Sequence, residues 1–251
     1  MGFVVVIPAR YASERLPGKP LIDLAGKAMI LRVCEQAAKS EADEVIVATD
    51  DERIVEAVEQ AGFNVVMTRA DHPSGTDRLQ EVCEVRGFPP SQVVVNVQGD
   101  EPLIPPLVIN QVAANLESAG TDMATLSEPV DSVDDLTDPD IVKVVTDEAG
   151  RALYFSRAPI PWPRDSFSGD DKVLPESLVP QRHLGIYAYR VSLLNDFVTW
   201  PACPLELTEK LEQLRAMWHG RKIHVAESVA SVPPGIDNPQ DVARTLAVLE
   251  S

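Results

Sequence analysis

The sequence predicts an α/β fold with a mostly parallel central sheet, and two observations support this prediction. Short apolar runs alternate with segments of helical periodicity through the first half of the 251-residue chain, which is typical of βα units. The runs are apolar at successive positions, as expected for parallel strands covered on both faces. We expect these strand and helix pairs: 3 to 7 with 29 to 39, 45 to 48 with 51 to 61, 64 to 67 with 77 to 86, and 93 to 97 with 106 to 117.

The second half of the chain is less regular. Residues 151 to 182 are rich in proline and charge, which predicts a strand at 153 to 155 followed by a long irregular excursion. The remaining expected elements are a strand at 184 to 189, an amphipathic helix from Leu207 to Trp218, a strand at 223 to 226 and a closing helix at 240 to 249.

The charge of the chain limits its partners. Lys and Arg number 22 against 39 Asp and Glu, a formal net charge of −17, and the resulting field opposes binding to nucleic acid or to an acidic membrane surface. A small anionic ligand therefore needs a local basic pocket or a divalent cation. The apolar run at the N-terminus is interrupted by Pro8 and Arg10, which is unlike a signal peptide or a membrane span. We expect a cytoplasmic protein.

The cysteines do not form a recognisable framework. Cys34, Cys83 and Cys203 are odd in number and have no CxxC spacing, which argues against disulfides and against a zinc ribbon. Cys34 and Cys83 lie among apolar helix positions, and we expect them in the core.

A cationic loop follows the first predicted strand. Arg10, Arg15 and Lys19 lie in a segment with Pro17, Gly18 and Pro20, and backbone N–H groups together with fixed cations offset clustered phosphate charge. This loop predicts a nucleoside triphosphate site, although a polar surface loop is the alternative. Neither a Walker loop nor a GxGxxG fingerprint is present.

Two acidic positions are candidates for a metal site. The strand at 93 to 97 leads into Gln98-Gly99-Asp100-Glu101, so Asp100 emerges at the carboxyl edge of the sheet, where ligands bind in such folds. Mg²⁺ needs only one or two carboxylates besides phosphates and waters, and Asp237 is the second candidate. The alternative for both is capping of the helix that follows. Capping is also the favoured role of Thr49-Asp50-Asp51, so Asp50 is not placed in the site.

Several further positions are compatible with substrate binding. Ser74-Gly75-Thr76-Asp77-Arg78 can meet a base or ribose and hold an anion, or can be a turn with an N-cap. Arg157 and His183 flank the Pro-rich excursion and can grip a carboxylate, but a lone His is commonly structural. Glu212 and Gln213 lie on a predicted helix, where polar residues usually face solvent.

Eight segments carry a resemblance to a known family. They are PARYASERLPGKP at 8 to 20, ATDDERI at 48 to 54, SGTDR at 74 to 78, VNVQGDEPLI at 95 to 104, YFSRAPIPW at 154 to 162, RHLGIYAYR at 182 to 190, LEQLR at 211 to 215 and PGIDNPQD at 234 to 241. Because these eight segments occur together and in this order, the chain resembles the 3-deoxy-D-manno-octulosonate cytidylyltransferase family, bacterial enzymes also called CMP-Kdo synthetases.

The resemblance implies a fold and an activity. The fold is a Rossmann-like nucleotidyltransferase of the glycosyltransferase-A type, a single domain over residues 1 to 251 with a dimerisation insertion at about 155 to 200. The implied reaction converts CTP and Kdo to CMP-Kdo and pyrophosphate with Mg²⁺, in a homodimer that serves lipopolysaccharide biosynthesis in a Gram-negative bacterium.

The resemblance also assigns roles to residues. It implies that Arg15, Lys19, Asp100 and Asp237 carry the chemistry and that Asp100 and Asp237 hold the metal. Residues that bind CTP are implied to be Ala9, Arg10, Arg15, Lys19, Ser74, Gly75 and Gln98. Residues that bind the sugar are implied to be Arg78, Gln98, Arg157, His183, Tyr187, Glu212 and Gln213.

The sequence is also compatible with other activities. One is transfer of CMP to a related acid, such as the 8-amino analogue of Kdo or a sialic acid. Another is a glycosyltransferase that consumes a nucleotide sugar, although Gln98 stands at the first position where the usual Asp-x-Asp motif would begin. A third is a nucleotide sensor that binds CTP without releasing pyrophosphate.

Overall fold

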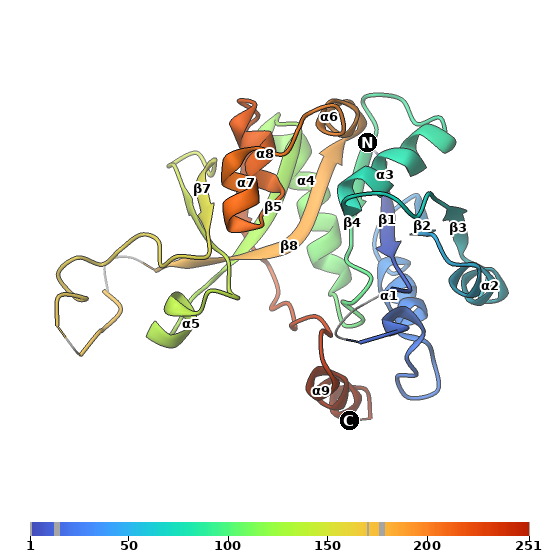
Figure 1. The fold of residues 1–251 in the computed structure, drawn as a ribbon, viewed down its shortest axis with the longest axis horizontal. Helices are drawn as coiled ribbons and strands as arrows, with labels where there is room; N and C mark the ends of the chain where they lie inside the picture. Colours follow the sequence, from blue (N-terminus) through green and yellow to red (C-terminus); the bar gives the residue numbers. More distant parts are fainter. Residues whose placement is uncertain (1, 13–15, 170, 176–178, 251) are drawn as a thin grey trace.

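The computed structural model describes residues 2 to 12, 16 to 169, 171 to 175 and 179 to 250. Its strands form one sheet in the order β3-β2-β1-β4-β8-β5-β9, with a β6–β7 hairpin joined to β8 (Figure 1). Along this order only β8 runs against its neighbours, so the expected mostly parallel sheet is confirmed. The strands are β1 (Phe3–Ala9), β2 (Glu44–Thr49), β3 (Asn64–Met67), β4 (Val93–Asn96), β5 (Met123–Pro129), β6 (Lys143–Thr146), β7 (Ala152–Ser156), β8 (Gln181–Arg190) and β9 (Ile223–Glu227).

The helices cover both faces of the sheet. They are a short 3-10 turn η1 (Lys19–Leu21), α1 (Met29–Ala37), α2 (Glu52–Gln60), α3 (Gly75–Val85), α4 (Pro106–Ala119), α5 (Val133–Thr137), α6 (Val191–Phe197), α7 (Pro204–Glu209), α8 (Gln213–Trp218) and α9 (Pro239–Leu249).

The alternation of side chains along β1 divides the core in two. Val5 and Ile7 point into a cluster with α1, α2 and α4, whereas Val4 and Val6 point into a cluster with α3, α6 and α8. This is the expected consequence of successive side chains pointing to opposite faces of a strand. Cys34 and Cys83 lie buried in these clusters, as predicted. Both faces of the sheet are therefore covered, which leaves the edge where the strands end as the place for a ligand.

The four predicted βα units are present as β1 to β4 with α1 to α4, and the predicted late strands are β7, β8 and β9. Strand β5 was not predicted. It buries Thr125 and Ser127, and Thr125 Oγ1 donates to the backbone carbonyl of Ile186 on β8 over 2.7 Å. Two hydroxyl groups thus interrupt the apolar run, and that of Thr125 is satisfied only through tertiary pairing with β8. Strand β6 and helices α5 and α6 were also not predicted.

The prediction of a single helix from Leu207 to Trp218 is wrong. Helix α7 ends at Glu209, and Lys210 adopts a left-handed conformation with φ of 56° before α8 begins at Gln213. The left-handed region is uncommon for a residue other than glycine. The break turns the chain so that residues 210 to 213 line a pocket.

Candidate active site

The cationic loop after β1 reaches two carboxylates. Lys19 Nζ lies 2.6 Å from Asp100 Oδ2 and 3.0 Å from Asp237 Oδ1, and its side chain is only 12% exposed. Gly18, in the left-handed region with φ of 69°, directs the chain into η1 at Lys19. The structure thus brings together three of the four residues expected to carry the chemistry, while Arg15 lies outside the described residues.

A backbone contact fixes the pairing of the two carboxylates. Ile236 N donates to Asp100 O over 2.9 Å, and a Cβ at Gly235 would lie 3.3 Å from the same carbonyl oxygen. The close approach of the two loops therefore suits a residue without a side chain. Helix α9 is capped by Asn238, so the capping alternative for Asp237 is not what the structure shows.

The donor set fits a divalent cation. Two carboxylates that already share one ammonium are spaced to share a metal, and they have the hard oxygen ligands that Mg²⁺ prefers. Within the described part of the chain no group of three or more His, Cys, Asp or Glu side chains could hold a metal by itself. A magnesium ion at this place would therefore need further ligands, such as phosphate oxygens and water.

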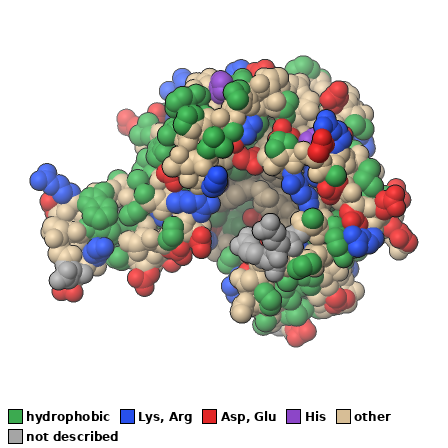
Figure 2. Space-filling model, in the orientation of Figure 1, with side chains coloured by type: hydrophobic (Ala, Val, Ile, Leu, Met, Phe, Trp, Pro, Cys, Tyr) green, Lys and Arg blue, Asp and Glu red, His purple; other side chains and the backbone are tan. Residues whose placement is uncertain are grey.

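A pocket of about 310 Å³ surrounds these carboxylates, and we call it the nucleotide pocket. Arg10 is held at its rim, where Nη2 donates to His72 O over 2.8 Å. Figure 2 shows the molecule hollowed at the centre of this face, with Lys or Arg side chains on both sides of the hollow. The residues that line the nucleotide pocket are Pro8, Ala9, Arg10, Ala12, Lys19, Pro20, Met29, Gln98, Gly99, Asp100 and Asp237.

Gly99 lets β1 and β4 approach each other at the floor of the nucleotide pocket. A Cβ at this position would lie 2.7 Å from Pro8 O, a backbone atom that cannot move without shifting β1. We expect Gly99→Ala to lower kcat/KM for nucleotide transfer by about 10- to 100-fold, because it displaces Asp100 relative to Ala9.

Steady-state kinetics would check the expectation for Gly99. Gly169→Ala is the matched control, since a Cβ there meets nothing within 4 Å and should leave the rate unchanged. Equal kinetics in both variants would contradict the close-approach argument.

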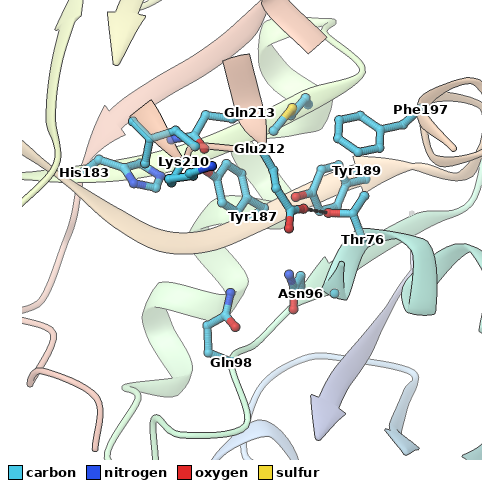
Figure 3. A pocket seen from close by; sticks show the side chains of 13 residues that line it. Thr76, Asn96, Gln98, His183, Tyr187, Tyr189, Phe197, Lys210, Glu212 and Gln213 are labelled. Carbon is cyan, nitrogen blue, oxygen red and sulfur yellow. Dashed lines mark hydrogen bonds between the residues drawn. The ribbon is translucent and has the colours of Figure 1, made fainter. Parts of the chain in front are cut away.

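A second pocket, of about 250 Å³, adjoins the first, and we call it the acid pocket (Figure 3). Gln98 lines both pockets and is oriented by its Nε2, which donates to Gly185 O over 3.1 Å. A ligand in one pocket therefore lies next to a ligand in the other. The residues that line the acid pocket are Gly75, Thr76, Asn96, Gln98, Met123, His183, Tyr187, Tyr189, Phe197, Lys210, Leu211, Glu212 and Gln213.

Burial keeps His183 neutral, and Thr125 fixes its tautomer. Burial lowers the pKa of His183 to about 3, so its ring is neutral near pH 7 and cannot balance a carboxylate by charge. Thr125 Oγ1 lies 2.7 Å from Ile186 O and 3.0 Å from His183 Nε2. Because the hydroxyl has one proton and the carbonyl can only accept, Thr125 donates to Ile186 O and accepts from His183 Nε2–H. The other ring nitrogen, Nδ1, is then a hydrogen-bond acceptor.

Glu212 closes the opposite side of the acid pocket. Thr76 Oγ1 donates to Glu212 Oε2 over 2.8 Å, which joins α3 to the start of α8. Burial raises the pKa of Glu212, while the hydrogen bonds from Thr76 and Ser74 act in the opposite direction. Glu212 and Gln213 therefore line the acid pocket, and the alternative of a solvated helix face is not what the structure shows, because the break at Lys210 turns them inward.

Two arginines expected to bind the sugar are not brought into either pocket. Arg78 is fully buried, where it contacts Thr68 and lies 3.2 Å from Asp50 Oδ2. Arg157 donates from Nε to Glu209 O and from Nη1 to Pro139 O, each over 2.8 Å. In this structure both guanidinium groups contact the fold itself.

The turn before α3 shows the expected capping. Ser74 Oγ accepts from Asp77 N, as an N-cap does, and Gly75 and Thr76 in the first turn line the acid pocket. Asp51 likewise caps α2 by accepting from Arg53 N, as the sequence favoured.

Sequence reasoning missed several residues of the acid pocket. Asn96 could have been found, since it lies two positions before Gln98 on the same side of β4 and its extension. Lys210 gave no signal, because only the backbone conformation at the helix break brings it to the pocket. The others missed were Met123, Tyr189, Phe197 and Leu211, whereas Thr76 lies in a segment that the sequence had already offered as a binding candidate. None of the described helices is both long and apolar enough to cross a membrane.

Comparison with known proteins shows which family the chain belongs to. A family model described as cytidylyltransferase matches residues 4–223. A protein of Cellvibrio japonicus named 3-deoxy-manno-octulosonate cytidylyltransferase is 60% identical, with 100% of this chain and 99% of the relative covered. A protein of the same name from Pseudomonas fluorescens is 57% identical over 99% of this chain and 98% of its own.

Two solved structures are similar to this chain, one at high identity and the other in fold alone. A structure described as CMP:2-keto-3-deoxy-manno-octonic acid synthetase complexed with CTP superposes with a TM-score of 0.91 at 41% identity, covering 100% of this chain and 99% of its own. The 4-diphosphocytidyl-2C-methyl-D-erythritol synthase of Anaerococcus prevotii shares the fold, with a TM-score of 0.63 at 14% identity and coverage of 100% and 99%. The chain therefore belongs to the cytidylyltransferase family.

Proposed function

We propose that this protein transfers the cytidylyl group of CTP to 3-deoxy-manno-octulosonate (Kdo), forming CMP-Kdo and pyrophosphate. The observation that carries the proposal is the shared wall of the two pockets at Gln98, with Lys19, Asp100 and Asp237 on the nucleotide side. The names of the full-length relatives supply the substrates. The product would be the activated sugar of lipopolysaccharide biosynthesis.

The reaction is a direct in-line displacement. The anomeric 2-hydroxyl oxygen of Kdo bonds to the α-phosphorus of CTP, the bond from that phosphorus to the β-phosphate bridging oxygen breaks, and the hydroxyl proton leaves to solvent. Pyrophosphate departs with the negative charge of the broken bond. No covalent intermediate with the enzyme is needed.

The residues of the nucleotide pocket hold CTP and offset this charge. Lys19 and Arg10 lie where fixed cations can stabilise the departing pyrophosphate, an electrostatic task that requires no proton transfer. Arg15 is proposed to share it. Ala9 of this pocket is proposed to border the cytidine. Ser74, the N-cap of α3, and Gly75, which lines the acid pocket, are proposed to reach the cytidine from the other side. In the acid pocket, Gln98, His183, Tyr187, Glu212 and Gln213 contact the sugar.

Magnesium is the proposed cofactor, held by Asp100 and Asp237. When bound, it lowers the pKa of the attacking hydroxyl and polarises the α-phosphate. Lys19, which lies between the two carboxylates in this structure, then contacts the phosphates instead.

The chain is proposed to act as a cytoplasmic homodimer. The described residues 157 to 169, 171 to 175 and 179 to 180 extend away from the sheet as an arm (Figure 1) and carry exposed apolar side chains, with Trp162 56%, Val173 62% and Val179 54% exposed. Such side chains favour a partner surface, and the arm lies within the proposed dimerisation insertion at about 155 to 200 of a single domain.

Pyrophosphate release tests the proposed function. With CTP and Mg²⁺, we expect release that is fastest with Kdo and slower with its 8-amino analogue or N-acetylneuraminate. A mixture without sugar is the blank. Fastest release with another acid would show that this acid, and not Kdo, is the acceptor. CTP binding without any release would contradict the proposal and favour a nucleotide sensor.

A further inference from the structure

The acid pocket contains one group suited to a carboxylate by charge. Among the described residues that line it, only Lys210 carries a fixed positive charge. His183 is neutral near pH 7, and Glu212 is itself a carboxylate that accepts from Thr76. An acid that enters this pocket must therefore be balanced by Lys210 or remain unpaired, which is costly away from water.

The side chain of Lys210 is free to make this contact. It is exposed, and within the described ranges the structure gives its Nζ no hydrogen bond or ion pair. In Figure 3 Lys210 lies near His183 and Gln213, while Glu212 turns away from them toward Thr76. Positive and negative groups of the acid pocket are thus separated.

Gln213 supplies a second, independent sign of an anionic ligand. Its side chain is 6% exposed, and its buried Nε2 has no hydrogen-bond partner among the described residues. A buried donor without an acceptor is costly. A carboxylate oxygen near Lys210 would satisfy it.

The backbone that carries Lys210 is held in place by Arg157. Arg157 Nε donates to Glu209 O over 2.8 Å, and Arg157 N donates to Glu209 Oε2 over 3.0 Å. Ser156 Oγ donates to the other carboxylate oxygen of Glu209 over 2.6 Å. Glu209 is thereby fixed through both its side chain and its carbonyl, directly before the left-handed turn at Lys210.

Resting on the proposed function, we infer that Lys210 binds the carboxylate of the sugar acid together with Gln213 Nε2, and that Arg157 is a positioning residue that fixes the turn. Lys210 is then the residue that selects an acidic acceptor over a neutral sugar. His183 Nδ1, as an acceptor, binds a hydroxyl of the same substrate.

Kinetics of Lys210→Gln test the inference. Loss of a charge-assisted contact is expected to raise KM for Kdo by about 10- to 100-fold, with KM for CTP unchanged. Lys210→Arg should restore most of the affinity. Lys39→Gln, an exposed lysine after α1, is the matched control and should behave as wild type.

A double variant separates positioning from direct binding. Arg157→Ala should raise KM for Kdo in the wild-type background but add little in the Lys210→Gln background, because it acts through Lys210. Additive effects would show that Arg157 binds the acid by itself and would overturn its role as a positioning residue.

The outcomes distinguish this inference from the proposed function. Wild-type protein that releases no pyrophosphate with any acid contradicts the function. Active wild-type protein whose KM for Kdo is unchanged by Lys210→Gln contradicts only the role of Lys210. A Kdo derivative whose carboxylate is converted to an amide should bind to the wild type more weakly than Kdo does. The same derivative should bind equally well to the wild type and to Lys210→Gln.

Discussion

Asp100→Asn is expected to leave the protein folded and to lower kcat for pyrophosphate release by roughly 100- to 1000-fold, the effect of removing one electrostatic group from a transition state. The carboxylate lies 2.6 Å from Lys19 Nζ and faces the nucleotide pocket. Asparagine has the same shape, and the bond from Ile236 N to the backbone oxygen of residue 100 is kept. The loss is therefore one of charge and of metal affinity.

Circular dichroism and thermal unfolding would verify the fold of Asp100→Asn, and a pyrophosphate assay over a Mg²⁺ titration would give kcat and the metal dependence. Asp43→Asn is the matched control, because Asp43 is exposed and lies next to Phe3 at the opposite end of β1. Near-normal turnover in Asp100→Asn at low Mg²⁺ would show that this carboxylate does not hold the metal.

Glu206→Ala is expected to reduce the free energy of unfolding by about 3–5 kcal/mol, as when one partner of a buried ion pair is removed. Glu206 and Arg215 have side chains that are 10% and 9% exposed, and Arg215 Nε donates to Glu206 Oε2 over 2.8 Å. The variant leaves the guanidinium of Arg215 buried without its carboxylate. It also removes half of the capping box with Cys203 at the start of α7.

The measurement for Glu206→Ala is urea unfolding at equilibrium, compared with Glu35→Ala. Glu35 pairs with Lys27 at the surface, with side chains 40% and 38% exposed, and such pairs contribute only about 0–1 kcal/mol. Equal destabilisation by the two substitutions would contradict the role given to burial. Since the pair joins α7 to α8, we also expect Glu206→Ala to weaken sugar binding through Lys210 and Gln213.

The first half of the fold followed from the sequence because its strands are apolar on both faces. The apolar periodicity of β1, β2 and β4 and of their helices can be interpreted without knowledge of any tertiary contact. Strand β5 could not be predicted in this way, since Thr125 and Ser127 are buried within it and the hydroxyl of Thr125 finds its hydrogen-bond acceptor on β8.

The nucleotide side of the site was also predictable. Lys19 lies in the loop that follows β1 and Asp100 lies shortly after β4, and parallel strands deliver their carboxyl ends to one edge. Asp237 was harder, because its approach depends on the contact between Ile236 N and Asp100 O across a long sequence separation. Its candidacy came from the resemblance as much as from its position.

The sequence by itself thus determined the α/β class, the cationic loop and the acidic strand end, since each depends on local periodicity or on a residue's place after a strand. Only the tertiary structure decided the acid pocket. The left-handed turn at Lys210, the tautomer of His183 and the burial of Arg78 all arise from contacts between segments far apart in the chain. No local pattern encodes such contacts, because the groups that satisfy them lie on other elements.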